Sequence, residues 1–162
     1  MSSLSKDARI AGLLYLAVVL LGPIRLLHIP NALFVTGNAA ATAHNIASHE
    51  QLFRIGVFAD LLTATVEIFV MLALYRLPNG VGRTLALIMV ILGMADVPTY
   101  FINTLNDFGA LAFARGTGFA AAFAQPQRDA MVMQYLDLHH YGVVVNEVFL
   151  GPVALTVCNS RL

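Results

Sequence analysis

Four long apolar stretches constrain this chain more than any other feature of its sequence. Each is long enough to cross the roughly 30 Å hydrocarbon core of a bilayer as a helix of about 20 residues. Hydrophobic residues make up 59% of the chain and charged residues 11%, against about 45–50% and 25% in soluble domains. We therefore expect an all-α, polytopic transmembrane helical bundle of about four spanning helices plus an interfacial helical segment, in one membrane domain over residues 1–162. The expected spans cover residues 8–29, 55–75, 84–106 and 133–157.

The first apolar stretch begins like a signal peptide but continues too far to be one. A short polar segment with Lys6 and Arg9 leads into it. The apolar residues then continue to residue 29 with no Ala-x-Ala cleavage site in a polar context, which favours a retained helix. Pro23 removes one helical hydrogen bond and is expected to kink this helix near its far end.

Two connecting segments and one short loop set the expected topology. Residues 30–54 mix turn residues with a predicted short helix, and residues 107–130 are expected to form a partly helical segment at the outer interface, ending at Pro126. Arg76 and Arg83 flank a short loop that contains no acid. Because cytoplasmic loops carry an excess of Lys and Arg, this loop and the amino terminus are predicted to be cytoplasmic, in the plasma membrane.

Several phrases occur in order along the chain and carry a family signature. They are ARIAGLLYL at 8–16, GNAAATAHNI at 37–46, FRIGVFADLL at 53–62, LALYRL at 72–77 and LDLHHYG at 136–142. With these phrases the chain resembles the bacterial domain-of-unknown-function 4386 family, whose members are multi-pass membrane proteins without an assigned activity. The resemblance implies a membrane helical bundle and implies nothing about a substrate.

Two features depart from the pattern of that family. Thr36, Gly37 and Asn38 stand where the family usually has Pro-Gly-Asp, which removes a charge from the connector. Family members also continue with further hydrophobic spans beyond the point where this chain ends. The resemblance therefore implies that the carboxyl-terminal spans of the family are absent here.

Polar residues recur at helical spacing within the second and third apolar stretches. Asp60 and Glu67 are seven residues apart, so they share one helix face within about 20°. Asp96 and Asn103 repeat the same spacing on the next stretch, on a face that also carries Thr99, Tyr100 and Asp107. Ionisable groups at membrane depth usually face the interior of a bundle, so both faces are expected to point inward.

The last apolar stretch carries polar residues on two opposite faces. Asp137, His140 and Glu147 fall within about 80° of one another on a helix, while His139 and Asn146 point the other way. The first face has more ionisable groups. We therefore predict that Asp137, His140 and Glu147 turn inward, and that His139 lies at the outer interface.

Depth along each predicted helix divides these residues into two layers. Glu67, Asp96 and Glu147 are placed near the midplane without a basic partner, so at least one of them is expected to be protonated or to share a cation. Asp60 lies in the outer layer with Asp137 and His140, which can neutralise each other. Arg25 lies at the same depth, where it either extends outward to the interface or pairs with an intramembrane acid such as Asp60.

Three functions remain open for this polar interior. It can hydrogen-bond the helices together, act as a proton or ion relay in a transporter-like or accessory membrane subunit, or hold a metal on Asp137, His140 and Glu147 in a membrane-embedded enzyme. No His-Glu-x-x-His pair, phosphate-binding loop or dinucleotide glycine pattern occurs. The sequence therefore favours a protein that is not an enzyme, with no cofactor.

Composition also limits the expected partners. Nine Lys and Arg residues balance nine Asp and Glu residues, so there is no basic surface for nucleic acid. The lone Cys158 excludes an internal disulfide and a multi-cysteine metal site. The lipid bilayer is the expected environment, and another copy of the chain or another membrane subunit is expected to cover the polar faces that a shortened bundle leaves.

Overall fold

The computed structural model describes residues 3–75 and 83–159, and within these ranges the described part of the chain contains helices and no strand. Side-chain surroundings are described for all of them except residues 3–5, 7–8, 83–86, 89, 147 and 149–159. The elements in order are α1 (Ser3–Pro23), η1 (Ile24–His28), α2 (Ile29–Leu33), α3 (Ala39–Ser48), α4 (Glu50–Tyr75), α5 (Arg83–Arg115), η2 (Gly118–Ala122) and α6 (Gln125–Asn159).

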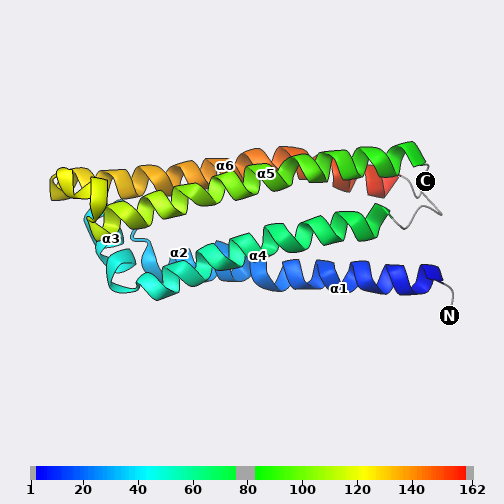
Figure 1. Cartoon of the computed structure of the whole chain (residues 1–162), viewed down its shortest axis with the longest axis horizontal. Helices are drawn as coiled ribbons and strands as arrows, with labels where there is room; N and C mark the ends of the chain where they lie inside the picture. Colours follow the sequence, from blue (N-terminus) through cyan, green and yellow to red (C-terminus); the bar gives the residue numbers. More distant parts are fainter. Residues whose placement is uncertain (1–2, 76–82, 160–162) are drawn as a thin grey trace.

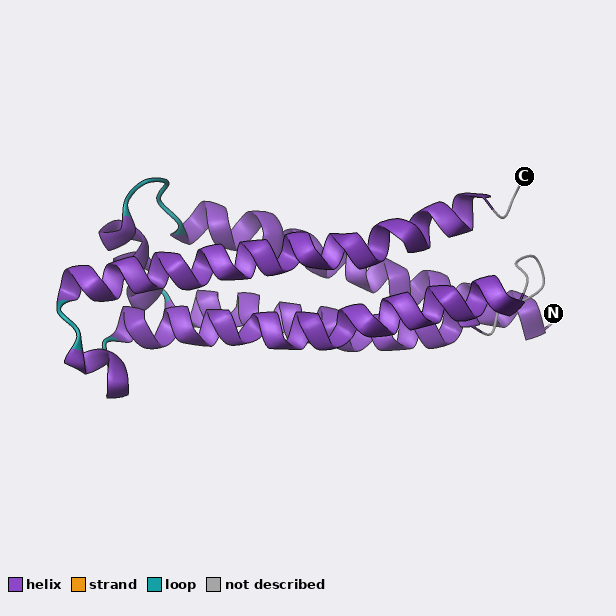
Figure 2. Ribbon diagram, turned by 90° about the horizontal axis from the view of Figure 1, so that it is seen from above, coloured by secondary structure: helices purple, strands orange, loops and turns teal. Residues whose placement is uncertain are grey.

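The long helices run back and forth along one axis, as an up-and-down bundle (Figure 1). The beginning of α1 and the end of α6 lie at the same end of the bundle, and α3 and η2 lie at the opposite end (Figures 1 and 2). α1 packs on α4, α4 on α5, and α5 on α6. The expected all-α bundle is therefore present.

The first helical segment changes its winding immediately after Pro23. The backbone N–H of Ile29 donates to the carbonyl of Ile24, five residues back, which makes η1 a π-helical turn. A proline has no N–H to donate and its ring crowds the preceding turn, so a local change in winding is a normal response. Arg25 is buried within this turn, whereas Ile24, Leu26 and His28 are exposed.

Short polar contacts fix the connector between the first and second long helices. The Asn38 side chain caps α3 by accepting from the N–H of Ala41 at 2.9 Å. Gly37 precedes it with φ +73°, a left-handed conformation that favours glycine. The Asn45 amide donates to the Leu33 carbonyl at 3.1 Å, which holds α3 against the end of α2.

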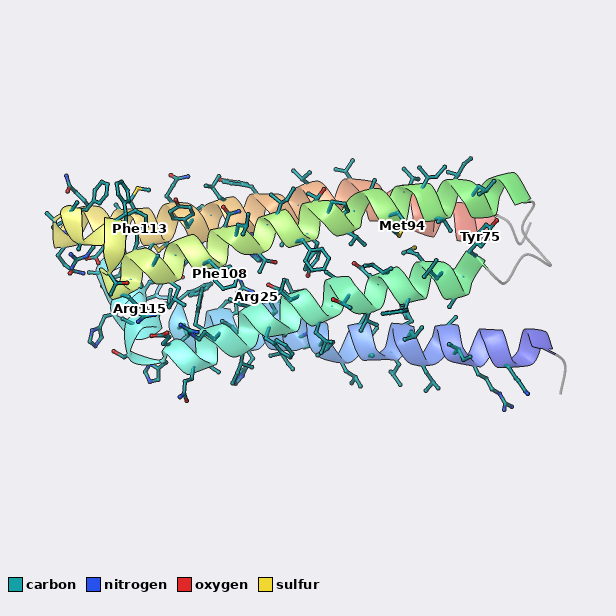
Figure 3. The ribbon with its side chains drawn as sticks, in the orientation of Figure 1. Arg25, Tyr75, Met94, Phe108, Phe113 and Arg115 are labelled. Carbon is teal, nitrogen blue, oxygen red and sulfur yellow. The ribbon has the colours of Figure 1, made fainter. Side chains whose placement is uncertain are left out.

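The main apolar core lies at the end of the bundle that carries α3. Its largest fully buried side chains are Ile29, Leu33, Ile46, Phe53 and Val132, and it also includes Ala110, Phe113, Ala120 and Leu136. Figure 3 shows Phe113 at this end of α5, close to Arg115. These residues come from every element except α1 and η1, so the core fixes the positions of the connecting segments as well as the long helices.

Glycines allow close approach between neighbouring long helices, among them Gly93 and Gly142. Gly93 of α5 lies against the Met71 side chain of α4, and Gly142 of α6 lies against the Asn103 side chain of α5. A β-carbon at either glycine would overlap these side chains. The two contacts therefore fix the register of α4 on α5 and of α5 on α6.

The segment 107–130 differs from the prediction of an interfacial re-entry. Residues 107–115 are the last turns of α5, a loop with the η2 turn follows, and α6 begins at Gln125, eight residues before the expected span. α5 is one helix of 33 residues that continues through Pro98. Ala110, Leu111 and Phe113 are buried in the apolar core, and this burial is why the helix continues past its polar residues.

Two helices in the described part of the chain are long and apolar enough to cross a membrane, judged by length and composition. They are Arg9–Leu33 and Glu50–Tyr75, which match the expected first and second spans. α5 and α6 are not among them, although each is long enough to exceed a bilayer core, at roughly 50 Å for 33 and 35 residues.

A candidate proton site inside the bundle

A buried ion cluster joins three of the long helical segments near the middle of the chain's fold. Arg25 Nε donates to Asp60 Oδ2 at 2.7 Å, and its Nη2 donates to Asp107 Oδ1 at 2.6 Å. The side chains of Arg25, Asp60 and Asp107 are 6%, 3% and 0% exposed. Figure 3 labels Arg25 part-way along the bundle. Of the two alternatives for Arg25, the structure has the pairing with an acid, and the expected partner Asp60 is one of the two acids involved.

His139 of α6 completes this cluster from the opposite side. Its Nδ1 lies 3.0 Å from Asp107 Oδ2, and its Nε2 lies 3.8 Å from Asp60 Oδ2. His139 Nδ1 and Asp107 Oδ2 are buried and have no hydrogen-bond partner among the described residues. A proton between these two atoms would satisfy both. We call Arg25, Asp60, Asp107 and His139 the Arg25 cluster.

The rotation of α6 decides which of its polar residues reach the interior. Val132 and Leu136 are buried in the apolar core, and residues 139, 143 and 146 continue the same stripe at spacings of three and four. His139 and Asn146 therefore point inward. The prediction that His140 and Asp137 face the interior is wrong, since both are exposed. Burial of the aliphatic side chains of Val132 and Leu136 outweighs the larger number of ionisable groups on the other face.

The third residue of the predicted face, Glu147, has a side chain outside the described residues. The described part of the chain therefore does not bring Asp137 and His140 together with the acids of α4 and α5. The metal set expected on Asp137, His140 and Glu147 therefore lies partly outside the described side chains. Asp137 and His140 instead border a cleft beside the Arg25 cluster.

That cleft lies between the first helical segment and α6. It has a volume of about 340 Å³, and Leu26, Pro30, Met133 and Leu136 are among its apolar walls. Arg25 and His139 also line it. The Arg25 cluster is thus reached from the side of the bundle where η1 and α6 face each other.

The backbone around His139 is held by Asn103 of α5. The Asn103 side-chain N–H donates to the backbone carbonyl of His139 at 2.9 Å, and the side-chain Oδ1 of Asn103 accepts from the Asn106 side-chain amide at 3.0 Å. Asn103 is buried, as predicted for its helix face. Its contact with Gly142 keeps α6 close enough for His139 to reach Asp107.

The other predicted interior residues lie further along the bundle. Asp96 is 1% exposed, and Glu67 is partly exposed with its Oε2 atom fully buried. They occupy α5 and α4 about two to three helical turns from the Arg25 cluster. Asn146 of α6 is also buried. Asp60 and Asp107 therefore lie in the Arg25 cluster and Glu67 and Asp96 further along the bundle, while the inward polar residues of α6 are His139 and Asn146.

Asp60, Asp107 and His139 are a set of described residues that could hold a metal ion, with one ligand atom from each lying within 4.8 Å of the others. Arg25 makes this set a poor site for a divalent ion. It already binds one oxygen of each carboxylate, and a divalent ion beside it would leave a net charge of +1 with neutral His139. The charges of these four groups balance with one added proton.

Two members of the Arg25 cluster are not among the residues expected to lie beside Arg25 and Asp60. Asp107 is expected on the inward face of its helix but at the end of the span, and His139 is expected at the outer interface. The signal that finds them is a shared heptad spacing, because 60 and 67, 100 and 107, and 139 and 146 are each seven residues apart. Antiparallel helices with the same repeat bring these residues to common levels.

One known protein family matches most of the chain. The family model described as Domain of unknown function (DUF4386) matches residues 10–159. The chain belongs to this family. The DUF4386 match covers every residue of the Arg25 cluster, all of α4, α5 and α6, and α1 from Ile10 onward. Searches of curated proteins and of solved structures give no match.

Proposed function

We propose that this DUF4386 protein crosses the plasma membrane four times, through α1 to α2, α4, α5 and α6, with its amino terminus in the cytoplasm. The observation that supports four spans is the apolar surface. Large apolar side chains are exposed along α5 and α6 as well as α1, among them Ile91, Ile102, Leu105, Val144 and Val148. Soluble monomers rarely expose apolar patches beyond a few hundred Å², and lipid would cover these side chains.

Within that bundle, we propose, the Arg25 cluster binds and releases a proton. Arg25 carries one positive charge against the two negative charges of Asp60 and Asp107, so the cluster has a net charge of −1 when His139 is neutral. Uncompensated charge is costly at membrane depth. A proton shared by His139 Nδ1 and Asp107 Oδ2, 3.0 Å apart, removes it. This contact is the observation that carries the proposal.

The cleft gives the proton a route to and from the cluster. His139 is 12% exposed, the most accessible side chain of the four, and it borders the cleft together with Arg25. Histidine also exchanges protons in the physiological range more readily than any other side chain. The arrangement fits a proton relay in a transporter-like protein or an accessory subunit of a membrane complex.

Proton flux into proteoliposomes tests this function. Purified protein is reconstituted with a pH-sensitive dye inside, and a potassium diffusion potential, negative inside, drives proton entry. We expect wild-type vesicles to acidify faster than empty vesicles, and the His139→Gln variant to lose most of the difference. His140→Gln is the matched control and keeps the flux. Wild-type vesicles no faster than empty ones, or equal flux in His139→Gln, would contradict the proposal.

A further inference from the structure

The cleft beside the Arg25 cluster has apolar side chains on two facing walls. Leu26 of η1, Pro30 of α2 and Phe34, which follows α2, form one wall at spacings of four residues. Met133 and Leu136 of α6 belong to the other wall. The volume of about 340 Å³ is within the range of roughly 300–1,000 Å³ that is usual for small-molecule sites. The cleft can therefore hold an organic molecule with a substantial apolar part.

One carboxylate in the lining of the cleft, that of Asp137, has no partner among the described residues. It makes no ion pair or hydrogen bond with any of them. Met133 and His140 lie one helical turn away on either side, and both also line the cleft. His140 is near enough along the helix to neutralise Asp137, yet the two side chains form no ion pair. A carboxylate without a counter-ion is costly at membrane depth, so a cation in the cleft would stabilise Asp137.

The charges around the cleft sum to a negative value. Arg25 also lines the cleft, but its Nε and Nη2 already contact Asp60 and Asp107 at 2.7 and 2.6 Å. Together with Asp137, one positive charge stands against three negative ones, which gives a net charge of −2 while the two histidines of the lining are neutral. Even with both histidines protonated, the sum is zero. A cation is therefore attracted to the cleft, and an anion is not.

We propose that the cleft binds a lipophilic organic cation with one positive charge, such as an ammonium that carries an aromatic or alkyl group. Asp137 is its counter-ion, and the apolar walls hold its hydrocarbon part. The Phe34 ring packs against the apolar core, and the face of such a ring attracts an ammonium as well. The site does not depend on proton release by the Arg25 cluster.

Isothermal titration calorimetry with three ligands that share one skeleton tests this site. The ligands are phenylbutylammonium, the neutral phenylbutanol and the anion phenylpentanoate. Each is titrated into the purified full chain in an uncharged maltoside detergent at neutral pH, where an alkylamine remains protonated, with empty micelles as the blank. We expect one ammonium per chain, bound at least about tenfold more tightly than the alcohol, because a hydrogen bond to a charged group contributes that much. Phenylpentanoate should not compete.

Two substitutions and one matched control locate the cation. Asp137→Asn should weaken binding of the ammonium by about tenfold or more and leave binding of the alcohol unchanged. Leu26→Trp places a larger side chain in the cleft and should weaken binding of both ligands. Asp137 and Leu26 are exposed, so both variants are expected to fold. Glu50→Gln is the control, because it removes the same charge from a surface pair with Arg54 and should not change the affinity.

Four results would overturn the proposal. No binding of phenylbutylammonium would remove the site itself. Equal affinities for the ammonium and the alcohol would show that charge plays no part. Ammonium binding that Asp137→Asn leaves unchanged would place the cation elsewhere. Ammonium binding that disappears when phosphatidylethanolamine is added to the micelles would assign the cleft to a lipid headgroup.

These outcomes are separable from those of the flux experiment. Protein that binds the ammonium but carries no proton flux would refute the proton relay alone. Proton flux in a protein that does not bind the ammonium would refute the cleft site alone.

Discussion

Arg25 makes it possible for two aspartates to lie inside the bundle. Each carboxylate at membrane depth costs about 2.5 to 3.5 kcal/mol on insertion scales, and two carboxylates in contact with no base would repel each other. The guanidinium binds one oxygen of each, in a fork geometry that a lysine ammonium cannot reproduce. Asp60 and Asp107 are thereby held on either side of a single cation, with His139 facing both.

Removing that cation should be costly. We predict that Arg25→Leu lowers the free energy of unfolding by about 3 to 5 kcal/mol, the usual cost of leaving buried charges without their partner. Chemical or thermal unfolding in mild detergent measures it. Arg54→Leu is the control, because its contact with Glu50 is at the surface and such pairs contribute well under about 1 kcal/mol. Equal effects of the two substitutions would show that the buried contacts are not stabilising.

The two adjacent histidines should differ in the same assay. His139→Ala removes the ring nitrogen that lies 3.0 Å from Asp107 Oδ2 and with it the proton that the two atoms are proposed to share, so we predict a loss of about 1 to 3 kcal/mol in unfolding free energy. His140→Ala changes an exposed side chain and should be close to neutral. A larger loss of unfolding free energy for His140→Ala than for His139→Ala would show that His140, and not His139, is the buried histidine.

At the scale of helices, apolar periodicity predicts much of the helical architecture, but it does not predict which polar side chains lie in the interior. The all-α character of the described part of the chain was predictable, because long apolar runs favour helices. The rotation of α6 was not, since its two faces both carry polar residues. Val132 and Leu136 decide the rotation by packing against residues such as Ile46 and Phe53, which are about 80 to 90 positions away in the sequence.

The extent of α5 illustrates the same limit. Its polar residues and glycines near Asp107 and Arg115 resemble the end of a span, yet the helix continues because Ala110 and Phe113 are buried against other elements. Such tertiary burial overrides local propensity. For a similar reason the sequence leaves open whether Arg25 extends outward or pairs with an acid. The π-helical turn that directs Arg25 inward has no sequence signature beyond Pro23.

Close packing of α5 on α6 gives a prediction at this scale. Gly142→Ala improves helix propensity by up to about 1 kcal/mol, but its methyl group would overlap the Asn103 side chain. We predict a net loss of about 1 to 3 kcal/mol, typical of overpacking. Unfolding in detergent measures it, and Gly12→Ala is the control because nothing lies within 4 Å of a β-carbon there. A stabilised Gly142→Ala would show that the two helices are not in close contact.

For the whole molecule, the four spans that we propose would place both chain termini on one side of the membrane and the connectors with α3 and η2 on the other. The start of α1 and the end of α6 share one end, and α3 and η2 share the other (Figure 1). In the proposed topology the first end is cytoplasmic, because Arg76 and Arg83 flank the short loop between α4 and α5 in the sequence. The cleft beside the Arg25 cluster is nearer the end with α3, since Pro30 and Phe34 line it.

Cysteine labelling in intact cells tests this topology. Cys158 is first replaced by serine, and single cysteines are introduced at Lys6, Ser48 and Thr117. We predict that a membrane-impermeant maleimide labels the cysteines at 48 and 117 from outside and labels the cysteine at 6 only after permeabilisation. Labelling of all three from outside, or of 6 and 117 alike, would contradict the four-span topology.

The central claim is that His139 gains and loses a proton inside the bundle, and its ring nitrogens report that directly. ¹⁵N-histidine NMR of the protein in lipid nanodiscs, with His139→Gln to assign the signal, follows its protonation across the pH range. We predict that the His139 ring signal changes reversibly with pH and that Asp107→Asn alters its Nδ1 chemical shift, because Nδ1 lies 3.0 Å from Asp107 Oδ2. A His139 signal that stays unchanged from acid to alkaline pH, or one that Asp107→Asn does not move, would contradict the account.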